Sequence, residues 1–176
     1  MGRPKVAGES AERVVDARNA FIMTNLMRDV VKYGTAAKAM QLGRSDLAGK
    51  TGTTNDYIDA WFTGFQPSLV AVAWIGFDEP ASLGAGETGS QAALPIWMAY
   101  MAKALRGVPE ATFDVPEGVV TAAINPNTGL RDDAPGKVSE FFYQEYLPRT
   151  QEVREAEAAH PGDEAKVRDE IRNQLF

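Results

Sequence analysis

Apolar side chains recur every three or four residues in two segments of the chain, which is the periodicity of one helix face. The first segment, residues 17–33, follows Asp16, a suitable N-cap, and ends before Gly34, a suitable stop. The second segment, residues 91–105, follows Ser90, which can cap it in the same way. The pattern therefore predicts two α-helices.

Between these helices the pattern changes to one rich in β-branched and aromatic residues. Three strands are predicted, at residues 46–54, 58–65 and 69–77. Turn residues separate them, Asn55-Asp56 after the first strand and Gln66-Pro67-Ser68 after the second. Connections this short force neighbouring strands to run antiparallel, so the three are expected to form a meander.

Large aromatic side chains indicate which faces are buried. Tyr57, Trp61 and Phe65 share one parity around the second strand, which predicts that this face packs against a helix. Trp61, Trp74 and Trp97 are all predicted to lie in the core, because aromatic residues on regular elements usually bury their area.

The order helix, three strands, helix predicts an α+β fold, an antiparallel sheet with helices packed on it. Further along, residues 125–128 (Asn-Pro-Asn-Thr) predict a hairpin turn between a strand at 119–124 and a segment beginning at Gly129. The aromatic-rich segment 140–147 fits either an edge strand or a short helix.

The composition changes at about residue 150, where Glu, Ala, Arg and Asp become dominant. We therefore expect a folded part at residues 1–150 and a charged tail at 151–176 that is either a loosely held helix or disordered.

Composition excludes several classes of site. The 176 residues carry a net charge of -6, which argues against nucleic acid as a partner, and they contain no cysteine. The single histidine, His160, lies in the charged tail, so neither a His-based triad nor a multi-histidine metal site is available. No metal site and no cofactor are predicted. Arg44 and Asp46 are interpreted as a surface ion pair.

The segment 47–54, Leu-Ala-Gly-Lys-Thr-Gly-Thr-Thr, is the candidate functional motif. A phosphate-binding loop is one alternative, but it requires four residues between its two glycines, and five separate Gly43 from Gly49. A phosphate loop also needs a following helix, whereas this segment enters a meander. A lone Lys-Thr-Gly triplet would by itself favour the alternative of an ordinary strand with a surface lysine.

The triplet also matches the substrate strand of serine acyl-transferases that bind penicillin. Lys50 would place a positive charge beside a substrate carboxylate or a nucleophilic serine. Thr51 and Thr53 share one parity, so their hydroxyls can face one groove. Gly52 removes a side chain where another backbone approaches. An exposed edge strand of this kind can pair with an extended peptide.

The surrounding sequence strengthens this match. Matched segments follow one another at residues 19–35, 43–56, 59–65, 73–78 and 93–97. Together they resemble the bifunctional (class A) penicillin-binding proteins of the 1A type, over roughly residues 13 to 131.

The resemblance implies a partial penicillin-binding, β-lactamase-like transpeptidase fold. It also implies a peptidoglycan DD-transpeptidase as parent, a serine-type enzyme that acts on the outer side of the bacterial inner membrane, in the periplasm. Stem peptides and β-lactams are the implied ligands of the intact parent. The backbone N–H at Thr53 maps to a donor that holds the reaction's oxyanion.

The resemblance is incomplete, because the family also needs Ser-x-x-Lys and Ser-x-Asn motifs. The residues three positions after the six serines are Arg13, Ala48, Ala71, Ala85, Ala93 and Phe142. Those two positions after them are Glu12, Leu47, Val70, Gly84, Ala92 and Phe141. The chain thus holds no Ser-x-x-Lys nucleophile, and it is predicted to be inactive in isolation. We also expect the membrane anchor of the parent to be absent from these residues.

Three hypotheses stay open on the sequence. The chain is a catalytically incomplete portion of a transpeptidase that needs the upstream half of the domain as partner. Alternatively, it is a non-catalytic module that binds cell-wall peptide or a protein. In the third hypothesis, apolar surface exposed by truncation leads it to form homo-oligomers.

Overall fold

The computed structural model describes residues 13–132, 137–151 and 154. The chain divides into two compact units, Met1–Asp114 and Val115–Phe176. The boundary predicted at residue 150 stays a prediction, because only Gln151 and Arg154 of the charged tail are described. His160 lies outside the described residues.

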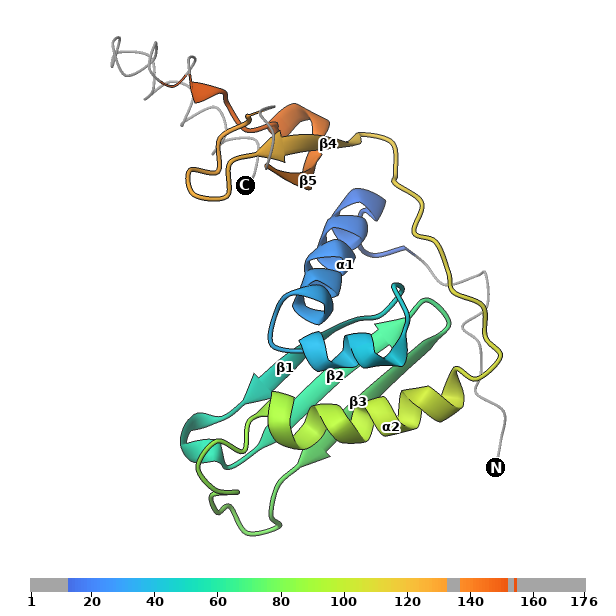
Figure 1. Cartoon of the computed structure of the whole chain (residues 1–176), viewed down its shortest axis with the longest axis vertical. Coiled ribbons are helices and arrows are strands. Elements are labelled where there is room, and N and C mark those ends of the chain that lie inside the picture. Colours follow the sequence, from blue (N-terminus) through green and yellow to red (C-terminus); the bar gives the residue numbers. More distant parts are fainter. Residues whose placement is uncertain (1–12, 133–136, 152–153, 155–176) are drawn as a thin grey trace. The chain divides into compact units, whose positions relative to one another are not determined.

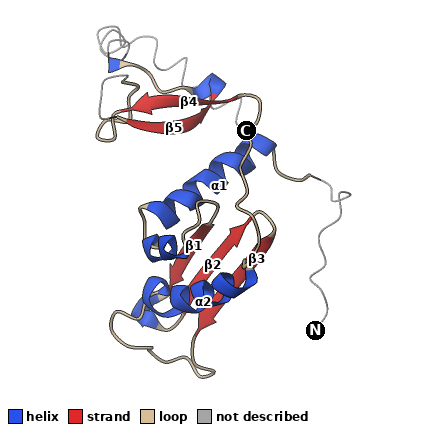
Figure 2. Cartoon of the chain, turned by 45° about the vertical axis from the view of Figure 1, so that its right-hand side comes forward, coloured by secondary structure: helices blue, strands red, loops and turns tan. Residues whose placement is uncertain are grey.

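The first unit has the α+β architecture that the apolar pattern predicts (Figures 1 and 2). Its main elements in chain order are α1 (Ala17–Lys32), a 3-10 helix (Ala37–Leu42), β1 (Ala48–Thr53), β2 (Ala60–Gln66), β3 (Leu69–Ile75), a π-helical turn (Gly89–Ala93) and α2 (Leu94–Ala104).

The three strands form the predicted antiparallel meander in the order β1-β2-β3. Lys50 of β1 lies opposite Thr63 of β2, and Thr51 lies opposite Phe62. Phe62 in turn lies opposite Ala73 of β3. Successive residues point to opposite faces of a sheet, so Thr51, Phe62 and Ala73 share one face and Lys50 and Thr63 share the other.

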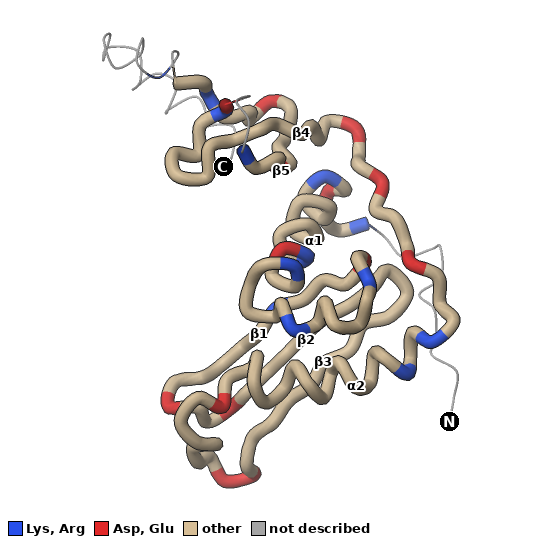
Figure 3. Tube along the Cα trace, viewed as in Figure 1, with Lys and Arg blue, Asp and Glu red and all other residues tan. Residues whose placement is uncertain are grey.

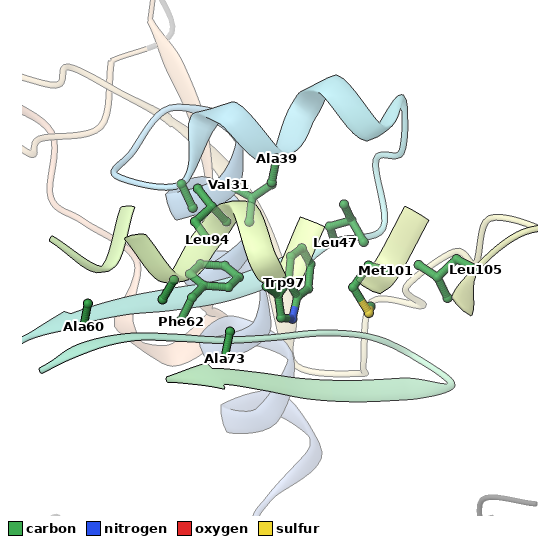
Figure 4. Packing of buried hydrophobic residues seen from close by; sticks show 12 residues of the cluster. Val31, Ala39, Leu47, Ala60, Phe62, Ala73, Leu94, Trp97, Met101 and Leu105 are labelled. Carbon is green, nitrogen blue, oxygen red and sulfur yellow. The ribbon is translucent and has the colours of Figure 1, made fainter. Parts of the chain in front are cut away.

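The core of the first unit lies between the sheet and α2, with the 3-10 helix beside α2 (Figure 4). Trp97 is its largest fully buried side chain, at 1% exposure. Its ring meets Phe62 edge-on, with the ring centroids 4.9 Å apart. The indole N–H donates to the carbonyl oxygens of Gly64 (3.3 Å) and Ala71 (3.1 Å). This one side chain therefore ties α2 to both β2 and β3.

The predicted packing face of β2 is wrong. Ala60, Phe62 and Gly64 are buried against the helix layer, whereas Tyr57 and Trp61 are exposed. The reason is room for Trp97, because a Cβ added at Gly64 would lie 2.7 Å from its ring. The helix approaches where the strand is small, so the larger aromatic residues of the other parity are turned outward.

The prediction of three core tryptophans holds only for Trp97. Trp61 and Trp74 are 41% and 47% exposed on the other face of the sheet. They lie opposite each other in the β2–β3 ladder, with ring centroids 5.8 Å apart. The Trp74 indole N–H also donates to the Asp59 carboxylate at 2.9 Å. Each therefore has a partner without entering the core.

The helix ends follow the predictions only in part. The Asp16 carboxylate accepts from the Arg18 N–H at 2.9 Å and caps α1 as predicted. Ser90 is not the cap of the second helix, because it lies inside the π-helical turn that leads into α2. The Ser90 hydroxyl instead pairs with the Thr88 hydroxyl at 2.9 Å.

The second unit contains a two-stranded antiparallel sheet of β4 (Val119–Ile124) and β5 (Val138–Tyr143), followed by a 3-10 helix, Gln144–Tyr146. The predicted turn is present, closed by a bond from the Asn125 N–H to the Leu130 carbonyl at 2.9 Å. The described part of the segment after Gly129, residues 130–132, however, makes an isolated bridge to β4, at Arg131. The segment 140–147 supplies both a strand and a helical turn.

Candidate functional site

The Lys50–Thr53 segment lies in β1, an edge strand of the sheet. Ala48 and Gly49 at the start of β1 are buried, Thr51 and Gly52 are half-buried, and Lys50 and Thr53 are exposed. The start of the strand is thus anchored in the core while its second half is accessible.

The two faces of β1 carry different chemistry. Thr51 and Thr53 lie on the face of Phe62, so the prediction that they share a face is confirmed. Lys50 lies on the opposite face, across from Thr63. A peptide that ran along this edge would have hydroxyl groups on one side and an ammonium group on the other.

Both threonine hydroxyls already have protein partners. The Thr51 Oγ1 lies 2.7 Å from the Thr35 Oγ1. The Thr53 Oγ1 accepts from the Gly89 N–H at 3.0 Å. Thr35 and Gly89 were not among the predicted site residues. Their signal in the sequence is weak, since each is a small residue in a glycine-containing turn.

Gly89 lies directly against the backbone of the candidate strand. A Cβ added there would be 2.3 Å from the Trp61 carbonyl oxygen and 2.5 Å from that of Gly52. The close backbone approach predicted at Gly52 is therefore present, and Gly89 makes it. A Cβ added to Gly52 itself would meet the Cβ of Trp61 at 3.2 Å.

The Lys50 ammonium donates to the Thr51 carbonyl oxygen at 3.1 Å. Among the residues that the structure describes, no carboxylate is recorded within salt-bridge distance of it. An ammonium has three donors, so two remain for a ligand. Exposure and the lack of a described counter-ion make Lys50 suitable for binding an anion.

Comparison with known proteins identifies the family of this strand. The family model described as the penicillin binding protein transpeptidase domain matches residues 4–96, which include all of β1, β2 and β3. The chain belongs to the penicillin-binding protein transpeptidase family. The sequence resemblance and the predicted fold are both confirmed.

The relatives and the solved structure are penicillin-binding proteins 1A. The protein from Pseudomonas aeruginosa is 50% identical over 132 residues, which are 75% of this chain and 16% of the relative. That from Neisseria flavescens is 53% identical over 119 residues, 68% of this chain and 15% of the relative. A crystal structure from Haemophilus influenzae matches with a TM-score of 0.75 and 35% identity, covering 80% of this chain and 22% of that one. The chain therefore spans about a sixth of the length of these relatives.

A buried ion pair holds the chain just before β1, the strand that carries Lys50; this segment is the entrance to the transpeptidase strand. Arg44 donates to both carboxylate oxygens of Asp46, at 2.8 and 2.7 Å. The same guanidinium donates to the carbonyl oxygens of Val108 (2.8 Å) and Pro109 (3.1 Å). Asp46 also accepts from the Ala111 N–H at 3.0 Å. The pair was predicted to lie on the surface, but the Asp46 side chain is fully buried and that of Arg44 is 12% exposed.

Arg44, Asp46 and the backbone groups that bind them form a clamp, in which the two opposite charges stabilise each other. Burial by itself would raise the pKa of Asp46, but the hydrogen bonds from Arg44 and Ala111 hold it below its ordinary value. The hydrogen bonds to Asp46 raise the pKa of Arg44. Beside the clamp, hydrogen bonds from the Ser45 hydroxyl and N–H lower the pKa of Glu110. The clamp therefore stays charged at neutral pH.

Four of the described serines have hydroxyl partners, and none of these partners is a lysine. The hydroxyls of Ser45, Ser68 and Ser82 donate to Glu110, Gln66 and the Asp56 carbonyl, respectively. None of these three has a lysine as its recorded partner, and the Ser90 hydroxyl pairs with Thr88. The geometry thus agrees with the lack of a Ser-x-x-Lys motif in the sequence.

Within the first unit, basic positions are spread over α1, the segment after it and the end of α2 (Figure 3). Lys50 is thus not part of a long run of cations.

None of the described helices is long and apolar enough to cross a membrane.

Proposed function

We propose that this chain forms one wall of the substrate cleft of a peptidoglycan DD-transpeptidase, and that Lys50, Thr51, Gly52 and Thr53 bind the substrate there. The ligand class is a D-alanyl peptide that ends in a carboxylate, or a β-lactam. The natural site of action would be the periplasmic face of the inner membrane.

The observation that carries this proposal is the exposed edge of β1. It presents an ammonium without a described counter-ion on one face and two threonine hydroxyls on the other, all on a strand whose start is anchored in the core. An edge strand can pair with an extended peptide through its backbone, and a cation nearby favours a terminal carboxylate. A single wall encloses little of a ligand, so binding by this chain alone is expected to be weak.

Acyl transfer requires a nucleophile that this sequence does not supply. A chain of these 176 residues, incubated with a fluorescent penicillin and run on a denaturing gel, is expected to give no labelled band. Addition of the transpeptidase segment that precedes the matched region in the Pseudomonas relative is expected to restore labelling, since that segment would bring the serine to the Lys50 strand.

The control for this mixing experiment is Lys50→Met, which keeps the length of the side chain and removes its charge. Labelling in the mixture is expected to fall strongly with this variant. A labelled band from the chain alone would contradict the proposal of inactivity. If the mixture fails to label while the chain binds the dipeptide N-acetyl-D-alanyl-D-alanine, an independent binding module is favoured.

The partner surface for this proposal lies on the outward face of the sheet in the first unit. Trp61, Val70, Val72 and Trp74 are all exposed there, at 41–66%. A groove of about 350 Å³ continues this surface beside β3, between Val72 and residues Ile96 and Tyr100 of α2. We propose that the remainder of the transpeptidase domain covers this face, and that copies of the chain self-associate through it when nothing else does.

The self-association prediction concerns Val70 and Val72. Changing both to threonine keeps the shape and strand propensity but makes the patch polar, so the dissociation constant of the oligomer is expected to rise about tenfold. Analytical ultracentrifugation over a range of concentrations measures this constant. Val138→Thr, a similar change at an exposed strand position of the second unit, is the matched control. A wild-type chain that is monomeric at every concentration would contradict the prediction.

A further inference from the structure

We infer that Thr35 is a positioning residue, which donates its hydroxyl hydrogen to Thr51 and so leaves the Thr51 hydroxyl hydrogen for an anionic ligand. The inference rests on the proposed function of the Lys50 strand and deepens it. Its basis is a closed chain of contacts on one face of β1, in which the Thr35–Thr51 pair is one link.

Thr35 is held rigidly by the turn that ends α1. The Gly34 N–H donates to the carbonyl oxygens of Asp29 and Val30, both at 3.1 Å. On the other side of Thr35, the Ala36 N–H donates to the Val30 carbonyl at 3.1 Å, and Ala36 is fully buried. The turn leaves no room for a side chain at Gly34, where an added Cβ would lie 2.9 Å from the Val30 Cα. The position of Thr35 is therefore set by backbone contacts on both sides.

The contact between the hydroxyls of Thr35 and Thr51 is short, at 2.7 Å. Thr51 is half-buried and Thr35 is exposed. A hydroxyl has one hydrogen and two acceptor positions, so only one of the two can donate along this line. If Thr35 donates, the Thr51 hydrogen is directed away from Thr35 and is available to a ligand on the edge of β1.

Two further links close the chain of contacts. The Gly89 N–H donates to the Thr53 Oγ1 at 3.0 Å, which leaves the Thr53 hydroxyl hydrogen free as well. The Lys38 ammonium donates to the Gln91 Oε1 at 2.7 Å. Lys38 follows Thr35 by one turn, and Gln91 follows Gly89 by two residues. The Lys38–Gln91 hydrogen bond thus links the turn that carries Thr35 to the turn that carries Gly89.

This arrangement presents two hydroxyl donors of preset orientation on one side of an exposed strand. Donors that are already oriented lose less entropy when a carboxylate binds than donors that rotate freely. Hydrogen bonds to a charged acceptor are also stronger than those between neutral groups. Thr35 therefore has an effect on ligand affinity although it need not touch the ligand.

The test uses the whole 176-residue chain and two variants at position 35. Thr35→Val removes the hydroxyl and keeps the shape, whereas Thr35→Ser keeps the hydroxyl. Three-bond couplings to the Thr51 methyl group, measured by NMR without ligand, report whether its side chain occupies one rotamer. Titration with N-acetyl-D-alanyl-D-alanine gives the affinity. Thr121→Val, an exposed threonine on β4, is the matched control.

We expect a single Thr51 rotamer in the wild type, in Thr35→Ser and in Thr121→Val, and averaged couplings in Thr35→Val. We expect Thr35→Val to bind the dipeptide roughly fivefold more weakly, with an unchanged midpoint of thermal unfolding, and Thr35→Ser to bind as the wild type does. A purely structural threonine would change the midpoint and not the rotamer. Thr35→Ala replaces Thr35→Val if the valine variant misfolds.

The inference is overturned if Thr51 keeps one rotamer in Thr35→Val, or if that variant binds as tightly as the wild type. In either case, the proposed function is not contradicted if the wild type binds the dipeptide. If the wild type itself does not bind the dipeptide, ligand binding by the isolated strand is contradicted, and the ligand-free couplings still decide whether Thr35 orients Thr51.

Discussion

Replacing Trp97 by alanine is expected to lower the free energy of unfolding of the first unit by roughly 4 kcal/mol. Trp97 is 1% exposed, and its removal would leave a large cavity between α2 and the sheet. The change would also remove the donor to the Gly64 and Ala71 carbonyls. A loss of this size is a large part of the stability of an ordinary domain, so the variant is expected to be partly unfolded near body temperature.

Urea unfolding followed by tryptophan fluorescence measures this effect, because Trp61 and Trp74 remain as reporters in the same unit. Trp61→Ala is the matched control, since it deletes the same side chain at a position that is 41% exposed. Its cost is expected to be at least about 2 kcal/mol smaller. Equal losses for the two variants would show that Trp97 is not the centre of the core.

Gly64 explains why the sequence pattern predicted this core only in part. The two helices and the order of the three strands followed from periodicity and from the short turns between strands. Which face of β2 is buried did not follow, because Tyr57, Trp61 and Phe65 suggested the wrong parity. A sheet that receives a tryptophan from a helix needs a small residue there, and Gly64 provides it. That requirement involves Trp97, 33 residues away, and no local pattern expresses it.

The candidate site shows the same limit. Lys50, Thr51, Gly52 and Thr53 could be found because they are contiguous and match a family motif. Thr35 and Gly89 could not, because each reaches β1 only across the fold, the first by a hydrogen bond to Thr51 and the second by a hydrogen bond to Thr53 and by packing against Gly52. Long-range contacts of this type leave no spacing rule in one sequence.

Asp46 is a second case in which the environment overrides the sequence pattern. Asp46 lies two residues before β1, and its ion pair with Arg44 was predicted to be an ordinary surface feature. The chain after α2 returns to cover it, and three backbone groups of residues 108–111 bind the two side chains. The pair is therefore the attachment between the entrance of the transpeptidase strand and the end of the first unit.

Asp46→Asn is accordingly expected to destabilise the first unit by roughly 3 kcal/mol at neutral pH, because it leaves the guanidinium of Arg44 largely buried without its counter-charge. Asp16→Asn is the matched control. It also changes a carboxylate to an amide, but at an exposed helix N-cap, where asparagine caps about as well as aspartate. Urea unfolding of the two variants and the wild type makes the comparison, and a change of less than about 1 kcal/mol in Asp46→Asn would contradict the buried clamp.

The difference between Asp46→Asn and the wild type is also expected to depend on pH. The folded chain holds the pKa of Asp46 below its ordinary value, so the unfolded chain takes up a proton first as the pH falls. The stabilisation by the carboxylate is therefore complete above the ordinary pKa of about 3.9 and is lost as the pH falls through the lower, folded value. Unfolding at about pH 7, 5 and 3 should give a constant difference between the first two conditions and a smaller one at the third. A difference that stays constant down to the lowest pH would mean that packing of the side chain, and not its charge, holds the entrance to β1.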